Sequence, residues 1–142
     1  MIIYKSAYNI INNLITDEPP ETGGILGSND GNIITNVIVD RNMEASIKRC
    51  IYSPNVDFLN ECIATWAEEN IVFMGIFHTH FMGVETLSDA DKKYIHEIME
   101  AMPKEIESLF FPVFVLPNRI LACYKVERRC IMEIKRDNLK II

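Results

Sequence analysis

The chain has 142 residues, of which 49% are hydrophobic and 24% charged, with a formal net charge of −6. This composition is typical of an ordinary globular protein, and the length fits one domain, residues 1–142, that buries roughly 70% of its unfolded surface. The acidic balance argues against nucleic acid and anionic membranes as main partners. Charged residues interrupt every apolar run before the ~18 residues of a transmembrane helix, and no signal-peptide pattern is present, so a cytoplasmic protein is expected.

The four cysteines are Cys50, Cys62, Cys123 and Cys130. None belongs to a C-x-x-C pair, so the main interpretation is that they are reduced and packed as small hydrophobic side chains. Cys123 and Cys130 could face each other across a hairpin, which keeps a disulfide or a site for a soft metal as the alternative interpretation.

The chain begins with a helical pattern that is followed by strands. Ser6 is a suitable N-cap for the helix, and Asp17-Glu18-Pro19-Pro20 ends it because two prolines remove backbone donors. The apolar stripe expected on this helix is Ala7, Ile10, Ile11, Leu14 and Ile15. Residues 23–27 and 32–39 have strand patterns, joined by a tight turn at Ser28-Asn29-Asp30-Gly31.

The middle of the chain predicts a second helix and a central strand. After a polar loop over residues 40–48, a short strand is expected over 49–53, and Ser53-Pro54 begins a helix with the serine as its N-cap. The buried stripe of this helix is expected to be Phe58, Leu59, Cys62, Ile63 and Trp66. Residues 71–77 are apolar almost without interruption, which is typical of a central strand covered on both faces.

The last third predicts a helix followed by strands. Residues 82–87 are expected to form a loop and 88–102 a helix that Pro103 ends. Strands are expected over residues 109–115, 120–126 and 130–134. The whole pattern predicts an α/β fold with a mixed β-sheet flanked by helices.

The end of the central strand carries the residues best suited to chemistry. His78 and His80 are two apart on a strand, so they project from one face and can share a metal ion. Helical spacing through Ile98 places Asp91, and Ser88 one turn earlier, on the stripe that faces the protein body. An inward carboxylate is costly unless it is paired or binds metal, so Asp91 is the candidate third ligand. A capping box with Ser88 as the N-cap is a compatible interpretation.

Three protein ligands leave a fourth position for water, as in catalytic zinc sites, where the metal lowers the pKa of that water toward ~7. Such a site needs a base, and Glu21, just before Gly23-Gly24, is the candidate. Taken alone, Glu21 would be interpreted as a solvated surface residue. Ser88 is a candidate hydrogen-bond donor to the oxyanion that forms when a carbonyl is attacked. His96 is expected at the surface, because it lies five residues after Asp91 and off the inward stripe.

Glu21, then His78-Thr79-His80, then seven residues and Ser88-Asp89-Ala90-Asp91 match the JAMM motif, E…H-[ST]-H-x7-S-x-x-D. The chain therefore resembles the MPN+ (JAB) zinc metalloprotease family, in its prokaryotic form, over nearly its whole length. The resemblance implies a single MPN/JAB-like domain in which His78, His80 and Asp91 bind one catalytic Zn²⁺, Glu21 is the general base and Ser88 stabilises the tetrahedral intermediate. Phe81 departs from the proline that many members have after the second histidine.

The resemblance also implies a substrate. Members of the family cleave isopeptide or peptide bonds after the C-terminal tail of ubiquitin or a ubiquitin-like protein, and prokaryotic members also process sulfur-carrier proteins of ubiquitin fold. We therefore expect a zinc-dependent isopeptidase or peptidase that binds such a tail along a strand edge near Gly23 and Gly24. Alternatives are a non-catalytic MPN-type interaction scaffold and a zinc hydrolase acting on another small substrate. A homo-oligomer is compatible with the sequence.

Overall fold

A seven-stranded mixed sheet dominates the computed structural model, which describes residues 1–40 and 52–142. Its strands are β2 (Gly23–Ser28), β4 (Asn36–Asp40), β5 (Val72–His80), β6 (Ser108–Phe110), β7 (Val113–Val115), β8 (Ile120–Glu127) and β9 (Ile134–Asp137). The order is β4-β2-β5, then β6 and β7 in succession, then β8 and β9. The central position of β5 and the mixed α/β architecture confirm the sequence prediction.

Three two-residue strands form a second, parallel sheet that the sequence did not predict. These are β1 (Ile2–Ile3), β3 (Ile33–Ile34) and β10 (Lys140–Ile141), with β1 between the other two. Strands this short have no detectable alternation of apolar and polar residues. A single 3₁₀ turn, η1 (Arg128–Cys130), connects β8 to β9.

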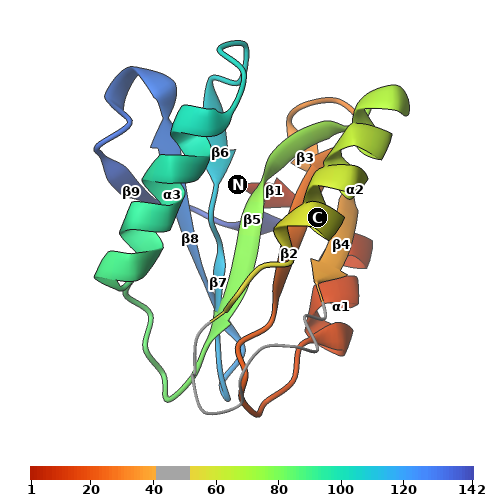
Figure 1. The fold of residues 1–142 in the computed structure, drawn as a ribbon. Coiled ribbons are helices and arrows are strands. Elements are labelled where there is room, and N and C mark those ends of the chain that lie inside the picture. Colours follow the sequence, from red (N-terminus) through yellow and green to blue (C-terminus); the bar gives the residue numbers. More distant parts are fainter. Residues whose placement is uncertain (41–51) are drawn as a thin grey trace.

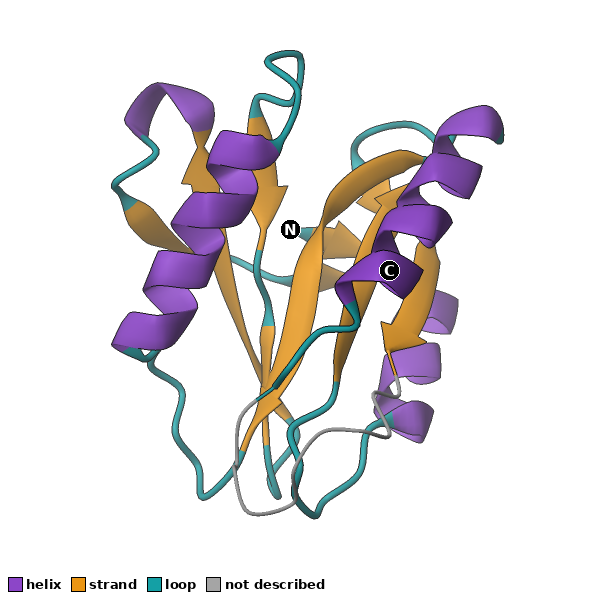
Figure 2. Ribbon diagram, viewed as in Figure 1, coloured by secondary structure: helices purple, strands orange, loops and turns teal. Residues whose placement is uncertain are grey.

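The helices cover both faces of the large sheet. They are α1 (Lys5–Leu14), α2 (Val56–Glu68) and α3 (Asp89–Ala101). Figure 1 shows α2 and α3 on one face and α1 on the other, and Figure 2 shows the sheet running between them. Within the described ranges, no helix has the length and apolar character needed to cross a membrane.

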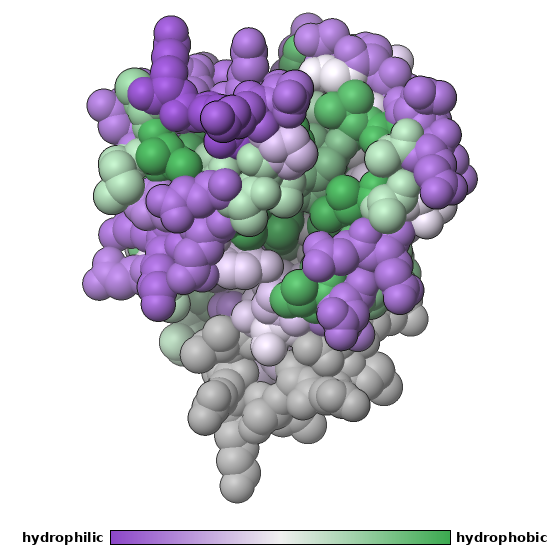
Figure 3. Space-filling model, turned by 45° about the horizontal axis from the view of Figure 1, so that its top comes forward, coloured by the Kyte–Doolittle hydropathy of each residue, from purple (hydrophilic) through white to green (hydrophobic). Residues whose placement is uncertain are grey.

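Two hydrophobic clusters, one on each side of the sheet, make up the core. Leu59 and Trp66 of α2 and Ile95 and Met99 of α3 pack in the first cluster with side chains from the facing strands. The second cluster contains the buried face of α1 and the small sheet. Figure 3 shows hydrophobic side chains between α2 and α3 and hydrophilic ones along the outer sides of these helices. Trp66 therefore has the core position that was expected.

The predicted N-caps of the first two helices are wrong. The first helix begins at Lys5 and follows β1 directly, so Ser6 lies inside its first turn, and the carbonyl of Ile142 accepts from the Lys5 N–H instead of a side-chain cap. The second helix begins two residues later than expected, because the Asn55 side chain accepts from the Phe58 N–H. Among the expected stripe residues, Ile10 and Phe58 are exposed.

Strand boundaries differ from the prediction where backbone donors are missing or occupied. The expected strand over 109–115 is broken into β6 and β7 at Pro112, which has no N–H to donate. The expected strand over 130–134 begins only at Ile134, because residues 128–130 turn as η1. The expected loop over 40–48 and strand over 49–53 fall mostly outside the described residues, and Asp40 itself ends β4.

The cysteines in the described part of the chain are Cys62, Cys123 and Cys130, and all three are free. The alternative of a Cys123–Cys130 disulfide is therefore wrong. Cys123 is opposite Asp137 in the β8–β9 pairing, whereas Cys130 lies in η1. Cys123 is buried and the other two are half-buried. Cys50 lies outside the described residues.

Candidate metal centre

The two histidines lie at the C-terminal end of β5, at the lower end of the strand in Figure 1. Ile76 of the same strand belongs to the core cluster under α2 and α3, so His78 and His80, at steps of two, face the same side. Both residues are buried, with exposed fractions of 8% and 6%. The sequence expectation of two adjacent imidazoles on one face agrees with this placement.

Asp91 reaches these imidazoles from the first turn of α3. Its Oδ1 lies 3.4 Å from His78 Nε2 and its Oδ2 lies 3.4 Å from His80 Nε2. The two Nε2 atoms are 2.9 Å apart, and one ligand atom from each of the three residues falls within 4.8 Å of the others. Residues separated by a loop in the sequence are thus brought to one point.

These separations fit a metal ion with nitrogen and oxygen ligands. Ligands of tetrahedral zinc lie about 3.3–3.4 Å apart when the bonds are about 2.0–2.1 Å. Both histidine–aspartate separations match this value, and the 2.9 Å histidine–histidine separation is about 0.4 Å shorter. Two imidazoles and a carboxylate can hold zinc, but this donor set does not by itself identify the metal.

A hydrogen bond orients His80 for this role. Its Nδ1 lies 3.1 Å from the carbonyl oxygen of Val84, and a carbonyl can only accept, so Nδ1 carries the proton and Nε2 presents its lone pair. Such an outer hydrogen bond fixes the tautomer and ring orientation of metal-binding histidines. Because Val84 belongs to the loop after β5, that loop contributes directly to the site.

The loop is attached to β8 and β9 at the next residue. The Tyr124 hydroxyl donates to the Glu85 carbonyl at 2.7 Å, and Arg136 donates to the Glu85 carboxylate at 2.8 Å. Arg136 also donates to the Tyr124 hydroxyl at 3.2 Å. These bonds restrain the backbone that places the Val84 carbonyl against His80.

Ser88 and Asp91 form the capping box that the sequence suggested. Ser88 Oγ accepts from the Asp91 N–H, and the Ser88 N–H donates to Asp91 Oδ2 at 2.7 Å. Ser88 Oγ also donates to Asp91 Oδ2 at 2.7 Å, so the hydroxyl proton is directed at the carboxylate. Ser88 itself is exposed, which corrects the prediction that it faces the protein body. It lies before the first turn of α3 and lines the cavity beside the centre.

The charge state of Asp91 follows from these contacts. Burial raises its pKa, but its interactions with His78 and His80 and the hydrogen bond from Ser88 outweigh burial and hold the pKa well below its usual range. The pKa of His80 is raised: burial lowers it, and the hydrogen bond with Asp91 and the nearby charge of Glu21 more than compensate. The centre is therefore anionic on the carboxylate side and attracts a cation.

Glu21 precedes β2 and lines the same cavity as His80 and Asp91. Its Oε2 accepts a hydrogen bond of 2.9 Å from the backbone N–H of Tyr52. Burial raises the pKa of Glu21, partly offset by this hydrogen bond and by the two histidines. A carboxylate with a raised pKa beside a candidate metal site is suited to act as a base.

Thr79, between the two histidines, holds the segment that carries Glu21. Its side chain accepts from the Thr22 N–H at 2.8 Å, and its own N–H donates to the Thr22 carbonyl at 2.8 Å. Thr79 is completely buried. These two bonds fasten the residue after Glu21 to the strand that carries both histidines, a function that the sequence analysis did not assign.

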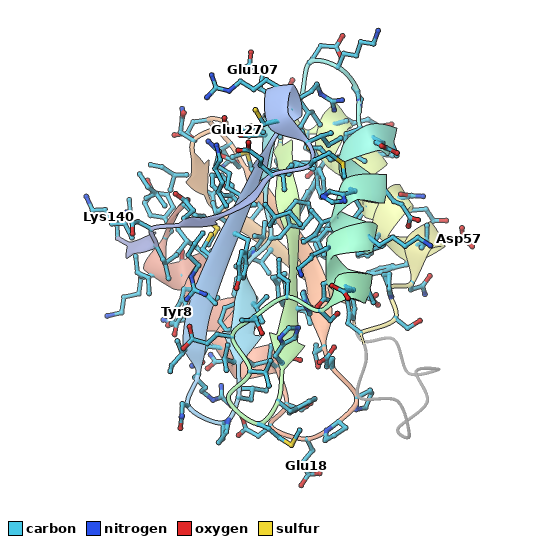
Figure 4. The ribbon with its side chains drawn as sticks, turned by 90° about the vertical axis from the view of Figure 1, so that its left-hand side faces the viewer. Tyr8, Glu18, Asp57, Glu107, Glu127 and Lys140 are labelled. Atoms are coloured by element: carbon cyan, nitrogen blue, oxygen red, sulfur yellow. The ribbon has the colours of Figure 1, made fainter. Side chains whose placement is uncertain are left out.

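A cavity of about 940 Å³ opens beside the centre. Its lining includes Glu21, His80, Ser88 and Asp91, and the other lining residues are mainly apolar. These are Pro19, Phe81, Met82, Val84, Leu87, Ala90, Leu116 and Pro117, with Asp17 and Thr86 as polar neighbours. Glu18 lies between the lining residues Asp17 and Pro19 in the sequence, and Figure 4 shows it at the end of the molecule where β5 terminates.

Comparison with solved structures establishes the fold. A JAB1/MPN domain protein from Archaeoglobus fulgidus aligns with a TM-score of 0.57 and 14% identity, over 100% of this chain and 99% of that one. The chain has an MPN/JAB-like fold. Solution structures of proteins from Desulfitobacterium hafniense and Salinibacter ruber align with TM-scores of 0.70 and 0.63, at 18% and 17% identity. Both alignments cover 100% of this chain, together with 93% of the Desulfitobacterium protein and 92% of the Salinibacter protein.

No family model and no curated protein matches the sequence. The similarity to known proteins therefore concerns the fold. The chemistry of the site has to be inferred from the positions of its residues. His78, His80 and Asp91 are together, and Glu21 and Ser88 line the same cavity. Tyr52 and Thr79, whose contacts hold the segment of Glu21, were not predicted from the sequence.

His96 is not the simple surface residue that was expected. It is half-buried, and its Nε2 is buried with no hydrogen-bond partner among the described residues. It lies next to the buried Ile95 and three residues before the buried Met99, so its ring falls at the edge of the inward stripe. It is not part of the His78–His80–Asp91 group.

Proposed function

We propose that this protein is a zinc-dependent isopeptidase or peptidase that cleaves after the C-terminal tail of a ubiquitin-like or sulfur-carrier protein. The observation that carries the proposal is the convergence of His78, His80 and Asp91 beside a cavity that Glu21 also lines. The fold of the JAB1/MPN domain protein from Archaeoglobus fulgidus supports it. In hydrolysis, water adds across the amide bond and releases a carboxylate and an amine.

Each of the five site residues has a separate proposed role in this reaction. His78, His80 and Asp91 would hold the ion, which when bound supplies a water of lowered pKa and polarises the scissile carbonyl. Glu21 takes a proton from the attacking water and passes it to the departing amine, while its Oε2 accepts from the Tyr52 N–H. Ser88 is proposed to stabilise the oxyanion, for which its hydroxyl proton must turn away from Asp91.

We propose a path for the substrate tail that differs from the one expected from the sequence. Gly23 and Gly24 of β2 are paired with β4 on one side and β5 on the other, so neither edge of the strand is free to receive a peptide there. The cavity instead lies between residues 17–21 and the loop over 81–87. Its apolar lining suits an extended tail with small or apolar side chains next to the scissile bond, and Met82, 89% exposed, lies on its outer wall.

The proposal is tested with purified protein, stripped of metal and reloaded with Zn²⁺. The probes are a ubiquitin-fold protein ending in Gly-Gly joined by an isopeptide bond to a fluorescent lysine peptide, and a linear fusion of the same protein. The reloaded wild type should cleave at least one probe, and Glu21→Gln should bind the same zinc but lose about 10²-fold or more of the rate. Zinc binding without cleavage of either probe would favour the non-catalytic scaffold.

A further inference from the structure

The residue that holds Glu21 is itself held by a second carboxylate. The Tyr52 N–H donates to Glu21 Oε2, and the hydroxyl of the same residue donates to Asp40 Oδ2 at 3.1 Å. Asp40 is the last residue of β4 and is only 3% exposed. Its Oδ2 also accepts from the Asn55 N–H at 2.7 Å. One buried carboxylate thus holds both the Tyr52 side chain and the beginning of α2.

The ring of Tyr52 covers the beginning of β2, the strand that follows Glu21. A Cβ added at Gly23 would lie 2.4–2.6 Å from three carbon atoms of this ring, so the ring lies directly on the glycine backbone. The ring is also nearly parallel to the His78 imidazole, at 12° and with 6.4 Å between the centroids. The ring therefore lies close to Gly23 and His78, and its hydroxyl is bonded to the Asp40 carboxylate.

We propose that Tyr52 is a positioning residue for Glu21, with Asp40 as the anchor that keeps the Tyr52 backbone in place. The pairing of Gly23 with Asp40 in the sheet supports this, because the anchor and the segment of Glu21 belong to neighbouring strands. The hydrogen bond holds one carboxylate oxygen of Glu21, a residue that lines the cavity. The inference rests on the proposed role of Glu21 as the base.

Tyr52→Phe tests the anchor, because it removes the hydroxyl and leaves the ring and the backbone N–H. At full zinc loading, kcat for the isopeptide probe should fall about threefold to tenfold, the effect of losing one ordinary hydrogen bond, while KM and zinc content change less than twofold. Asp40→Ala should cause at least the same loss. Asp40→Asn should retain most of the rate, because an amide oxygen can accept from both partners.

Tyr8→Phe is the matched control. Tyr8 stacks on Phe114 on the far side of the sheet from α3, as Figure 4 shows, so loss of its hydroxyl should leave kcat unchanged. A residue that only stabilises the fold would lower the unfolding midpoint and leave kcat of the folded, zinc-loaded enzyme intact. An unchanged kcat in both Tyr52→Phe and Asp40→Ala would therefore overturn the inference.

Amide hydrogen exchange separates this inference from the proposed function, since it requires no activity. The backbone N–H of residue 52 should exchange slowly in the wild type, and at least tenfold faster in Glu21→Ala and in Tyr52→Phe. If the wild type cleaves no probe, the proposed function fails, and this exchange rate still decides whether Tyr52 holds Glu21. An unprotected N–H at residue 52 in the wild type would overturn the inference.

Discussion

Gly23→Ala should disturb the centre without touching any of its five predicted residues. The added Cβ would lie 2.4 Å from the nearest carbon of the Tyr52 ring, and an ordinary contact begins at 3.4 Å, so the ring must move by about 1 Å (3.4 − 2.4). The ring cannot move freely, because its hydroxyl is bonded to the buried Asp40. Overpacking of this kind costs about 1–3 kcal/mol of folding free energy.

The same displacement carries the Tyr52 N–H away from Glu21. A shift of about 1 Å in a catalytic group can lower a rate by up to ~10²-fold, so kcat of the zinc-loaded variant should fall between tenfold and a hundredfold. Urea unfolding measures the stability, and cleavage of the isopeptide probe measures kcat. Gly31→Ala is the control: its φ of +74° makes alanine unfavourable by about 1 kcal/mol, but nothing lies within 4 Å of the added Cβ.

A double-mutant cycle shows whether the ring causes the effect. In a Tyr52→Ala background the space over residue 23 is empty, so Gly23→Ala should cost less than about 0.5 kcal/mol, whereas Gly31→Ala should cost the same in both backgrounds. The reasoning is refuted if Gly23→Ala destabilises both backgrounds equally, or if it leaves stability and kcat unchanged.

Two further predictions concern buried groups near and far from the centre. Thr79→Val removes the acceptor of the Thr22 N–H, which should cost about 1–3 kcal/mol in urea unfolding and lower kcat. Thr79→Ser keeps this acceptor, so it should retain kcat and lose only the ~0.8 kcal/mol of its buried methyl group; equal kcat values of the two variants would contradict this. Burial raises the pKa of Cys123 to about 12, so its thiolate forms only at very high pH. At pH 8, iodoacetamide should label Cys123 about a thousandfold more slowly than an unperturbed thiol and more slowly than Cys130, a difference that unfolding should abolish.

Much of the candidate metal centre was predictable because its signals are local. Steps of two along a strand placed His78 and His80 on one face, and steps of three and four along a helix turned Asp91 inward. The capping box of Ser88 was visible for the same reason. The motif then added Glu21. This residue is too far from the others in the sequence for any helix or strand periodicity to connect them.

The support of Glu21 was not predictable, because it depends on contacts between distant segments. Tyr52 lies 31 residues from Glu21 and 12 from Asp40, and no spacing rule connects these positions. A charged residue directly after the apolar residues of β4 was the one available sign, and it was interpreted as the beginning of a loop. The two-residue strands and the start of α1 were not predictable for the same reason, since backbone partners from elsewhere in the chain decide them.

Calorimetric titration of the metal-free protein with Zn²⁺ tests the central claim most directly. The wild type should bind one ion per chain, and His96→Gln should bind it equally well because His96 lies outside the group of three ligands. Asp91→Asn keeps the shape of the side chain and should weaken binding by more than the ~10–100-fold that loss of a supporting hydrogen bond costs. A wild type that binds no ion, or an Asp91→Asn variant that binds as tightly as the wild type, would contradict the proposed metal centre.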